Sequence, residues 1–182
     1  MYMELKDVLA FADKKNPKEC LNYVRVDADA LCLVATNTKA MVKVTFESEE
    51  DFNEFLNSLP YKNGDKDASY SVITHEKTRT HISDKYPDYN RILVPSQRLS
   101  EPRFTHIPSG LFTREFFSFG CVLDFYGKDL KKPLEFLYTS SVGVYLQEQQ
   151  LPVHFYATGY FAISKTISVP VTLQAAVMPI CF

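Results

Sequence analysis

The stretch LNYVRVDADALCLVATNTKAMVKV at Leu21–Val44 decides the fold of this chain. Apolar and polar residues alternate through it in short runs, and this two-residue period is typical of half-buried strands. A turn is expected at Asp27-Ala28-Asp29, because acidic side chains bond readily to nearby backbone amides in turns. The pattern predicts three neighbouring strands, Cys20–Val26, Leu31–Val34 and Met41–Phe46, with a polar break at Ala35–Lys39 before the third.

A helix is predicted on each side of these strands. The first carries one apolar stripe at helical spacing and ends at Asn16-Pro17. The second begins at Ser48, a favoured N-cap residue, and the acids that follow suit the positive end of a helix dipole. Pro60 closes it. The two stripes are Leu5, Val8, Leu9 and Ala12, and Phe52, Phe55, Leu56 and Leu59.

The remainder of the chain indicates mostly strands. A hairpin is expected at Ala68–Thr74 and Thr78–Ser83. Four prolines between Pro87 and Pro108 indicate a linker or an extended crossing. Beyond it we expect a third helix at Thr113–Tyr126 and strands at Leu134–Thr139, Val142–Gln147, Val153–Ile163 and Val169–Ile180.

The composition is that of a globular protein, with 46% hydrophobic and 23% charged residues among 182. A net charge of -2 argues against a protein that coats nucleic acid through bulk charge. The start of the chain resembles no signal peptide, and no apolar stretch has membrane-spanning length, so we expect a cytoplasmic protein without membrane contacts. Its four scattered cysteines, expected as free thiols, are Cys20, Cys32, Cys121 and Cys181.

We recognise no supported enzyme motif in the sequence, and we predict a non-enzyme without cofactor or metal. His75 and His81 could face each other across the hairpin near Asp84, but the absence of tight ligand spacing favours an ordinary hairpin surface. Thr139-Ser140-Ser141 lacks the glycines of a nucleophile elbow and is better explained as a strand-end turn. The six glycines are dispersed, so no phosphate-binding loop is predicted.

Three segments, in the same order along the chain, resemble the bacterial DNA polymerase III beta sliding clamp family. The strands of Leu21–Val44 are similar to the family's paired strands that end in an Ala-Thr-Asp turn. YPDYNRILVP at Tyr86–Pro95 resembles the family's Phe-Pro-Asp-Tyr-Arg-Arg-Val-Leu-Pro stretch. AAVMPICF at Ala175–Phe182 resembles its closing Val-Val-Met-Pro-Met-Arg-Leu. Residues 1–95 resemble the family's middle domain, and residues 96–182 resemble a shortened final domain.

The resemblance implies an α+β fold of sliding-clamp-like domains, with antiparallel sheets and helices on one face. It also implies a hydrophobic pocket for linear peptide motifs of replication or repair proteins. Methionine suits such a pocket because its flexible side chain adapts to varied apolar partners. Two departures are an alanine, Ala40, where the family has arginine, and an extra residue, Val94. Carried over residue by residue, the pocket comprises Thr36, Met41, Leu93, Pro95, Val177, Met178, Pro179 and Ile180.

The resemblance further implies a homo-oligomeric ring around duplex DNA, held through phosphates without reading the base sequence. The second predicted helix argues against this role, because Glu49, Glu50, Asp51 and Glu54 would repel phosphate. An ordinary solvated face is the alternative for the basic residues. Those available for DNA contacts are Lys6, Lys14, Lys15, Lys18, Arg114, Lys128, Lys131 and Lys132.

Three functions therefore stay open at the level of sequence. The first is a clamp-like processivity factor that binds peptides and encircles DNA as an oligomer. The second is a clamp-fold interaction or regulatory protein that binds replication partners without forming a ring. The third is a β-rich structural protein whose resemblance is coincidental, which predicts that Leu93, Met178 and Pro179 lie far apart.

Overall fold

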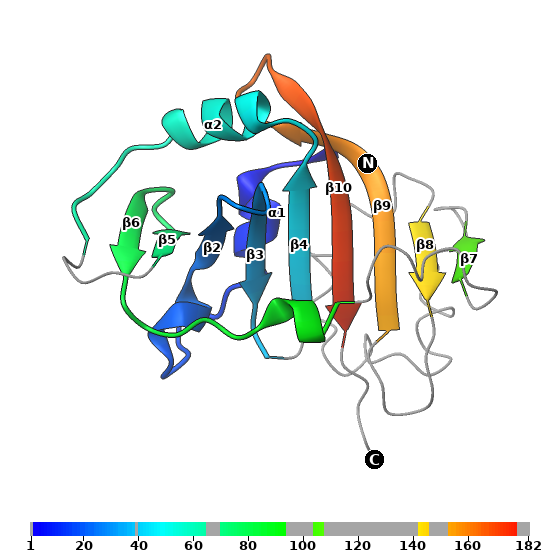
Figure 1. The fold of residues 1–182 in the computed structure, drawn as a ribbon, viewed down its shortest axis with the longest axis horizontal. Helices are drawn as coiled ribbons and strands as arrows, with labels where there is room; N and C mark the ends of the chain where they lie inside the picture. The colour runs from blue at the N-terminus through cyan, green and yellow to red at the C-terminus, as the bar shows by residue number, and fades with distance from the viewer. Residues whose placement is uncertain are drawn as a thin grey trace.

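The computed structural model describes residues 2–38, 40–64, 70–93, 104–107, 142–145 and 153–177. The strands of this part of the chain form one ten-stranded sheet (Figure 1) in the order β6-β5-β2-β3-β4-β10-β9-β8-β7, with β1 paired to β9. The strands are β1 (Tyr2–Met3), β2 (Val24–Asp27), β3 (Cys32–Thr36), β4 (Ala40–Phe46), β5 (Tyr70–Ile73), β6 (Arg79–Ile82), β7 (Phe104–Ile107), β8 (Val142–Tyr145), β9 (Val153–Ala162) and β10 (Ser168–Val177).

The sheet joins the two ends of the chain. β4 and β10 pair antiparallel over seven residues of each strand, from Phe46 opposite Val171 to Ala40 opposite Val177. On its other side β10 pairs with β9 along its whole length. Strands that are more than a hundred residues apart in the sequence therefore lie side by side at the centre of the sheet (Figure 1).

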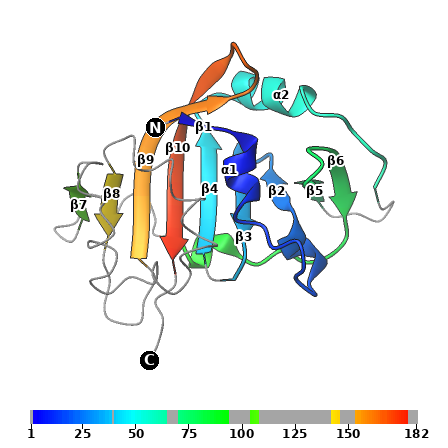
Figure 2. The same cartoon turned by 180° about the vertical axis from the view of Figure 1, so that it is seen from behind.

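Both helices pack on one face of the sheet, which we call the helix face. α1 (Leu5–Leu9) crosses in front of the sheet in Figure 2, and α2 (Glu49–Asn57) lies at the upper end of the sheet, above β2 and β3. Phe46 of β4 lies against three other rings, at centroid distances of 5.3 Å to Phe52, 5.6 Å to Phe55 and 5.4 Å to Phe161. This aromatic cluster packs α2 against β4 and β9, which come from the two ends of the chain.

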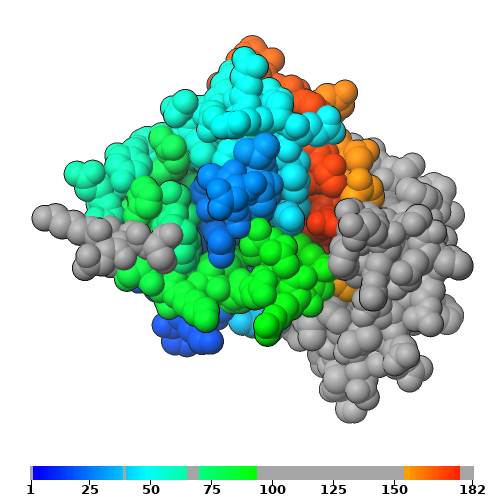
Figure 3. All heavy atoms as spheres, viewed as in Figure 1, coloured from blue at the N-terminus to red at the C-terminus, as the bar shows by residue number. Residues whose placement is uncertain are grey.

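The opposite face is covered by an extended segment, residues 83–93, which we call the strap. It leaves β6, crosses β3 and β4, and ends in the short 3-10 helix η2 (Tyr89–Arg91) (Figure 1). In Figure 3 the strap forms a green band across this face. Its buried residues Tyr86, Tyr89 and Leu93 share an apolar cluster with Met41 and Ala176 of the sheet. We call this side of the sheet the strap face.

The structure confirms an α+β fold and most of the predicted elements. Strands occur at each position expected between residues 24 and 46, and the hairpin of β5 and β6 is present. The first helix is shorter than expected, since only Leu5–Leu9 is α-helical. The predicted start of the first strand is instead the 3-10 helix η1 (Glu19–Asn22). The helix predicted at Thr113–Tyr126 and the strand predicted at Leu134–Thr139 lie outside the described residues.

Ser48 caps α2 as the sequence indicates, because its Oγ accepts a hydrogen bond from the Asp51 amide at 3.1 Å. Ser48→Ala removes that acceptor and is expected to lower the free energy of unfolding by about 1 kcal/mol. Urea unfolding measures the loss. Glu54→Ala, at an exposed position of the same helix, is the control, and an equally large loss in that variant would contradict the capping role.

Candidate functional site

Two of the predicted pocket residues lie on one row across the strap face. Thr36 of β3 is directly opposite Met41 of β4, and Met41 is directly opposite Ala176 of β10. Residues paired in this way project to the same side of a sheet. Val177, the next residue of β10, is paired with Ala40. The strands thus bring the Ala-Thr turn and the start of the C-terminal segment to the same end of the sheet.

Leu93 reaches this place from the strap. Its side chain belongs to the cluster that contains Met41 and Ala176. The Leu93 amide donates a hydrogen bond to the main-chain oxygen of Tyr89 at 3.1 Å, so Leu93 continues directly from η2. Three segments that are remote in the sequence therefore contribute buried side chains to one apolar cluster.

The turn between β3 and β4 is held by its own polar groups. Thr36 Oγ1 donates to the Ala40 carbonyl at 2.8 Å and accepts from the Thr38 amide at 3.2 Å. Asn37 Oδ1 accepts from the Ala40 amide at 2.8 Å. The Thr36 hydroxyl is therefore engaged within the turn, and Thr36 contributes position and apolar surface to the site rather than a free polar group.

The gathered side chains are buried, with exposed fractions of 5% for Thr36, 2% for Met41 and 7% for Leu93. They form an apolar base at the junction of β3, β4 and β10. Almost none of the surface of these three residues is exposed to solvent. The remaining predicted pocket residues, Pro95, Met178, Pro179 and Ile180, lie outside the described residues, and only the backbone of Val177 is described.

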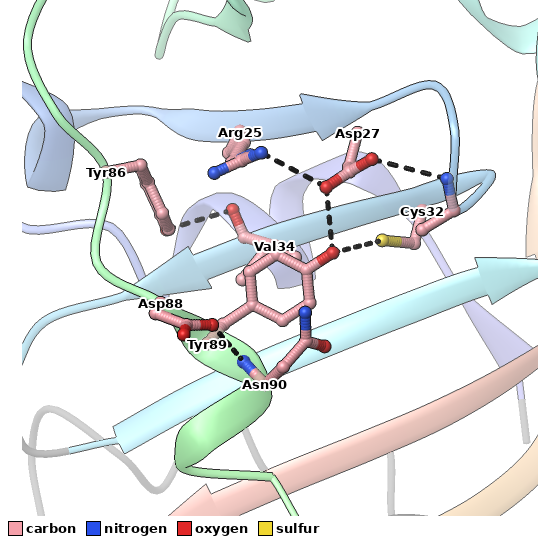
Figure 4. A network of polar contacts seen from close by, with 9 residues as sticks. Arg25, Asp27, Cys32, Val34, Tyr86, Asp88, Tyr89 and Asn90 are labelled. Atoms are coloured by element: carbon pink, nitrogen blue, oxygen red, sulfur yellow. Dashed lines mark hydrogen bonds and ion pairs between the residues drawn. The ribbon is translucent and has the colours of Figure 1, made fainter.

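A polar and aromatic network holds the strap on the sheet (Figure 4). The Arg25 guanidinium lies 5.2 Å from the ring centroid of Tyr70 and 5.6 Å from those of Tyr86 and Tyr89. It also forms an ion pair with Asp27, at 3.1 Å between Nη2 and Oδ2. Cations over ring faces are attracted by the ring quadrupole, more strongly where water is partly excluded. Arg25 therefore binds two strap rings and one sheet ring together.

Hydrogen bonds from both strap tyrosines complete the network. The Tyr89 hydroxyl donates to Asp27 Oδ2 at 2.8 Å, and the Tyr86 hydroxyl donates to the Val34 carbonyl at 3.2 Å (Figure 4). Burial raises the pKa of both phenols above the ordinary value, so they keep their protons and remain donors at neutral pH. The ammonium group of Lys43 lies 5.3 Å from the Tyr89 ring centroid. No local sequence pattern predicts this network, because its members come from separate segments of the chain.

The two described cysteines are unsuited to nucleophilic chemistry. Cys20 and Cys32 are free and buried. Burial raises the pKa of each thiol to about 11, so both are protonated at neutral pH. The Cys32 sulfur lies 3.8 Å from the Tyr89 hydroxyl, at the edge of the network around Asp27.

His154 extends the pocket row by one strand. It is paired with Ala176 across β9 and β10, and its exposed fraction is only 4%. Desolvation by burial lowers its pKa to about 4, so the imidazole is neutral at physiological pH. No local pattern points to His154, because its position on the row depends on the register between β9 and β10.

The histidines of the hairpin do not face each other. His81 is paired with Ser71, and its Nε2 lies 2.9 Å from Ser71 Oγ while its Nδ1 lies 3.1 Å from the Tyr61 hydroxyl. His75 lies in the hairpin turn. Within the described ranges no group of three or more histidine, cysteine or acidic side chains is placed to bind a metal ion. The hairpin-surface interpretation therefore fits these two residues better than a metal site.

The outer edge of β6 is covered by the chain's own residues 60–64. The Lys62 amide donates to the Arg79 carbonyl at 2.9 Å, and the Arg79 amide donates to the Pro60 carbonyl at 2.8 Å. A Cβ atom at Gly64 would lie 2.3 Å from the His81 carbonyl oxygen, which shows how closely the segment approaches β6. Covering an edge in this way prevents another strand from pairing there.

The basic residues proposed for DNA contacts are only partly described. Lys6, Lys14, Lys15 and Lys18 are exposed, and Lys6 forms an ion pair with Glu4 at 2.9 Å. α2, which packs on the same face as α1, exposes Glu49, Glu50 and Glu54. The rest of the predicted set, Arg114, Lys128, Lys131 and Lys132, lies outside the described residues.

Among the helices that the structure describes, none has the length and apolar character needed to cross a membrane. A scan against models of protein families, a search of curated proteins and a search of solved structures each found no match to this chain.

Proposed function

We propose that this chain is a clamp-like binding protein that accepts a linear peptide at the end of β3, β4 and β10. The supporting observation is the convergence of Thr36 and Met41, of Leu93, and of the strand that ends at Val177. The beta clamp resemblance implies this meeting of remote segments, whereas a coincidental resemblance gives no reason for it. The natural partners in this proposal are replication or repair proteins that carry short apolar motifs.

The chemistry of the site suits an apolar anchor. Met41 and Leu93 supply aliphatic side chains to the apolar base, and the strap fixes Leu93 in advance, which reduces the ordering that a peptide would impose. Binding energy in such sites is concentrated in a few buried contacts. A leucine or phenylalanine of the peptide is therefore the expected anchor.

Encirclement of DNA receives less support from the described residues than peptide binding. Ring subunits that continue one sheet into the next need open strand edges, and the outer edge of β6 is occupied by residues 60–64. α2 would also present acidic side chains from the helix face. We therefore propose peptide binding as the primary function, with a processivity ring as its extension. Light scattering tests whether a ring forms, because a chain that stays monomeric at high concentration contradicts a ring.

The peptide test uses a fluorescent peptide with a Gln-Leu-x-Leu-Phe motif and measures fluorescence anisotropy. Leu93→Ala is expected to weaken binding roughly tenfold or more, since it removes a contact at the base of the site. Ile82→Ala is the matched control, because Ile82 is equally buried in the same cluster but belongs to β6. Equal losses in the two variants, or no binding by the wild-type chain, would contradict the proposal.

A further inference from the structure

Arg25 and Asp27 lie on β2, away from the pocket row. Arg25 is paired with Val34 and Asp27 with Cys32, whereas the row of Thr36 and Met41 lies further along β3. Neither charged residue is paired with a pocket residue. The strap offers a connection between these two charged residues and the pocket row.

Tyr89 provides this connection. Its hydroxyl donates to Asp27 Oδ2 at 2.8 Å, and its main-chain oxygen accepts the amides of Ile92 and Leu93, each at 3.1 Å. The side chain of Tyr89 is thus fixed to β2, and its backbone fixes the end of the strap. Two hydrogen bonds, one from the side chain of Tyr89 and one to its main-chain oxygen, therefore link Asp27 to Leu93.

Arg25 supports the same connection in two ways. Its ion pair with Asp27 orients the carboxylate that receives the Tyr89 hydroxyl, and its guanidinium lies over the rings of both strap tyrosines. The pair is largely shielded, with side-chain exposures of 26% for Arg25 and 15% for Asp27. Partial burial strengthens such contacts relative to those in open water.

We infer that Arg25 and Asp27 are positioning residues for the peptide site, which hold Leu93 in place through Tyr89. The position of the strap follows from the contacts described above. The effect on peptide affinity, in contrast, rests on the proposed function. Release of Tyr89 frees η2 and lets Leu93 leave the apolar cluster that contains Met41. The apolar base of the site is then lost without any change in a residue that touches the peptide.

The test compares Tyr89→Phe and Arg25→Met with Tyr70→Phe. Tyr89→Phe removes only the hydroxyl that reaches Asp27. Tyr70→Phe is the matched control, because its ring also lies over Arg25 but its hydroxyl has no hydrogen-bond partner among the described residues. Amide hydrogen exchange is followed at Ile92 and Leu93, with Leu173 in β10 as the internal reference for the intact sheet.

Amide exchange at Leu93 is expected to accelerate about tenfold in Tyr89→Phe and Arg25→Met, because each variant weakens a charge-assisted contact that holds the strap. Exchange at Leu173 is expected to stay unchanged. Tyr70→Phe is expected to match the wild type. Peptide affinity should fall about tenfold in the first two variants and stay constant in the third.

Unchanged exchange at Leu93 in Tyr89→Phe would overturn the inference. Tighter peptide binding by that variant would also overturn it, because the strap would then compete with the peptide. A wild-type chain that binds no peptide defeats the proposed function instead, and the exchange measurement still decides whether Arg25 and Asp27 position Leu93.

Discussion

Phe161→Ala is expected to lower the free energy of unfolding by about 3–5 kcal/mol, the loss typical of a large buried ring replaced by alanine. Phe161 is fully buried, with its ring centroid 5.4 Å from that of Phe46 and 5.1 Å from that of Phe55. The variant leaves a cavity where β9, β4 and α2 meet, so the loss combines reduced burial with lost ring contacts.

Urea or thermal unfolding measures this loss, with Tyr160→Ala as the matched control. Tyr160 is the preceding residue of β9 and projects to the opposite face, where 56% of it is exposed. Its replacement is expected to change stability by about 0.5 kcal/mol or less. If the two variants lose similar stability, β9 does not pack against the first part of the chain in this way, and the continuous sheet would be wrong.

The stability of the protein is expected to fall between about pH 6.5 and pH 4 because of His154. Burial lowers the folded-state pKa of His154 from 6.5 to about 4. Below pH 6.5 the unfolded chain takes up a proton that the folded chain resists, so acid favours unfolding until the folded-state pKa is passed. The separation between the two pKa values corresponds to roughly 3 kcal/mol.

The measurement is urea unfolding of the wild type and of His154→Gln at about pH 7 and about pH 4.5. The wild type should lose roughly 2–3 kcal/mol more than the variant between these conditions. The carboxyls of Glu76 and Asp84, whose pKa values are lowered, affect both proteins equally and cancel in the difference. The same pH dependence in both proteins would show that His154 is not held neutral by burial.

Local patterns predicted the elements that are governed by local physics. A short apolar run located β3, alternation located β4, and Ser48 followed by acids located the start of α2. The first helix was overestimated because its apolar stripe continues past Leu9. Its last predicted turn is instead an irregular segment in which the Asp13 amide bonds to the Leu21 carbonyl. That bond joins residues that periodicity cannot relate.

The strap shows the limit of sequence reasoning more clearly. Prolines made residues 87–108 resemble a linker, and nothing local indicates that Tyr86 and Tyr89 dock on Arg25, more than fifty residues earlier. The pairing of β10 with β4, which places Val177 opposite Ala40, is equally non-local. For the pocket, the family resemblance supplied the expectation that periodicity could not.

The most direct measurement on the proposed site is a methyl NMR titration with the Gln-Leu-x-Leu-Phe peptide. Met41 and Ala176 each carry a methyl group in the apolar base, while the buried methyl of Ala12 lies outside that cluster and serves as the reference. Saturating peptide is expected to shift the Met41 and Ala176 signals and leave the Ala12 signal in place. Binding that leaves Met41 and Ala176 unshifted would contradict a peptide site at the junction of β3, β4 and β10.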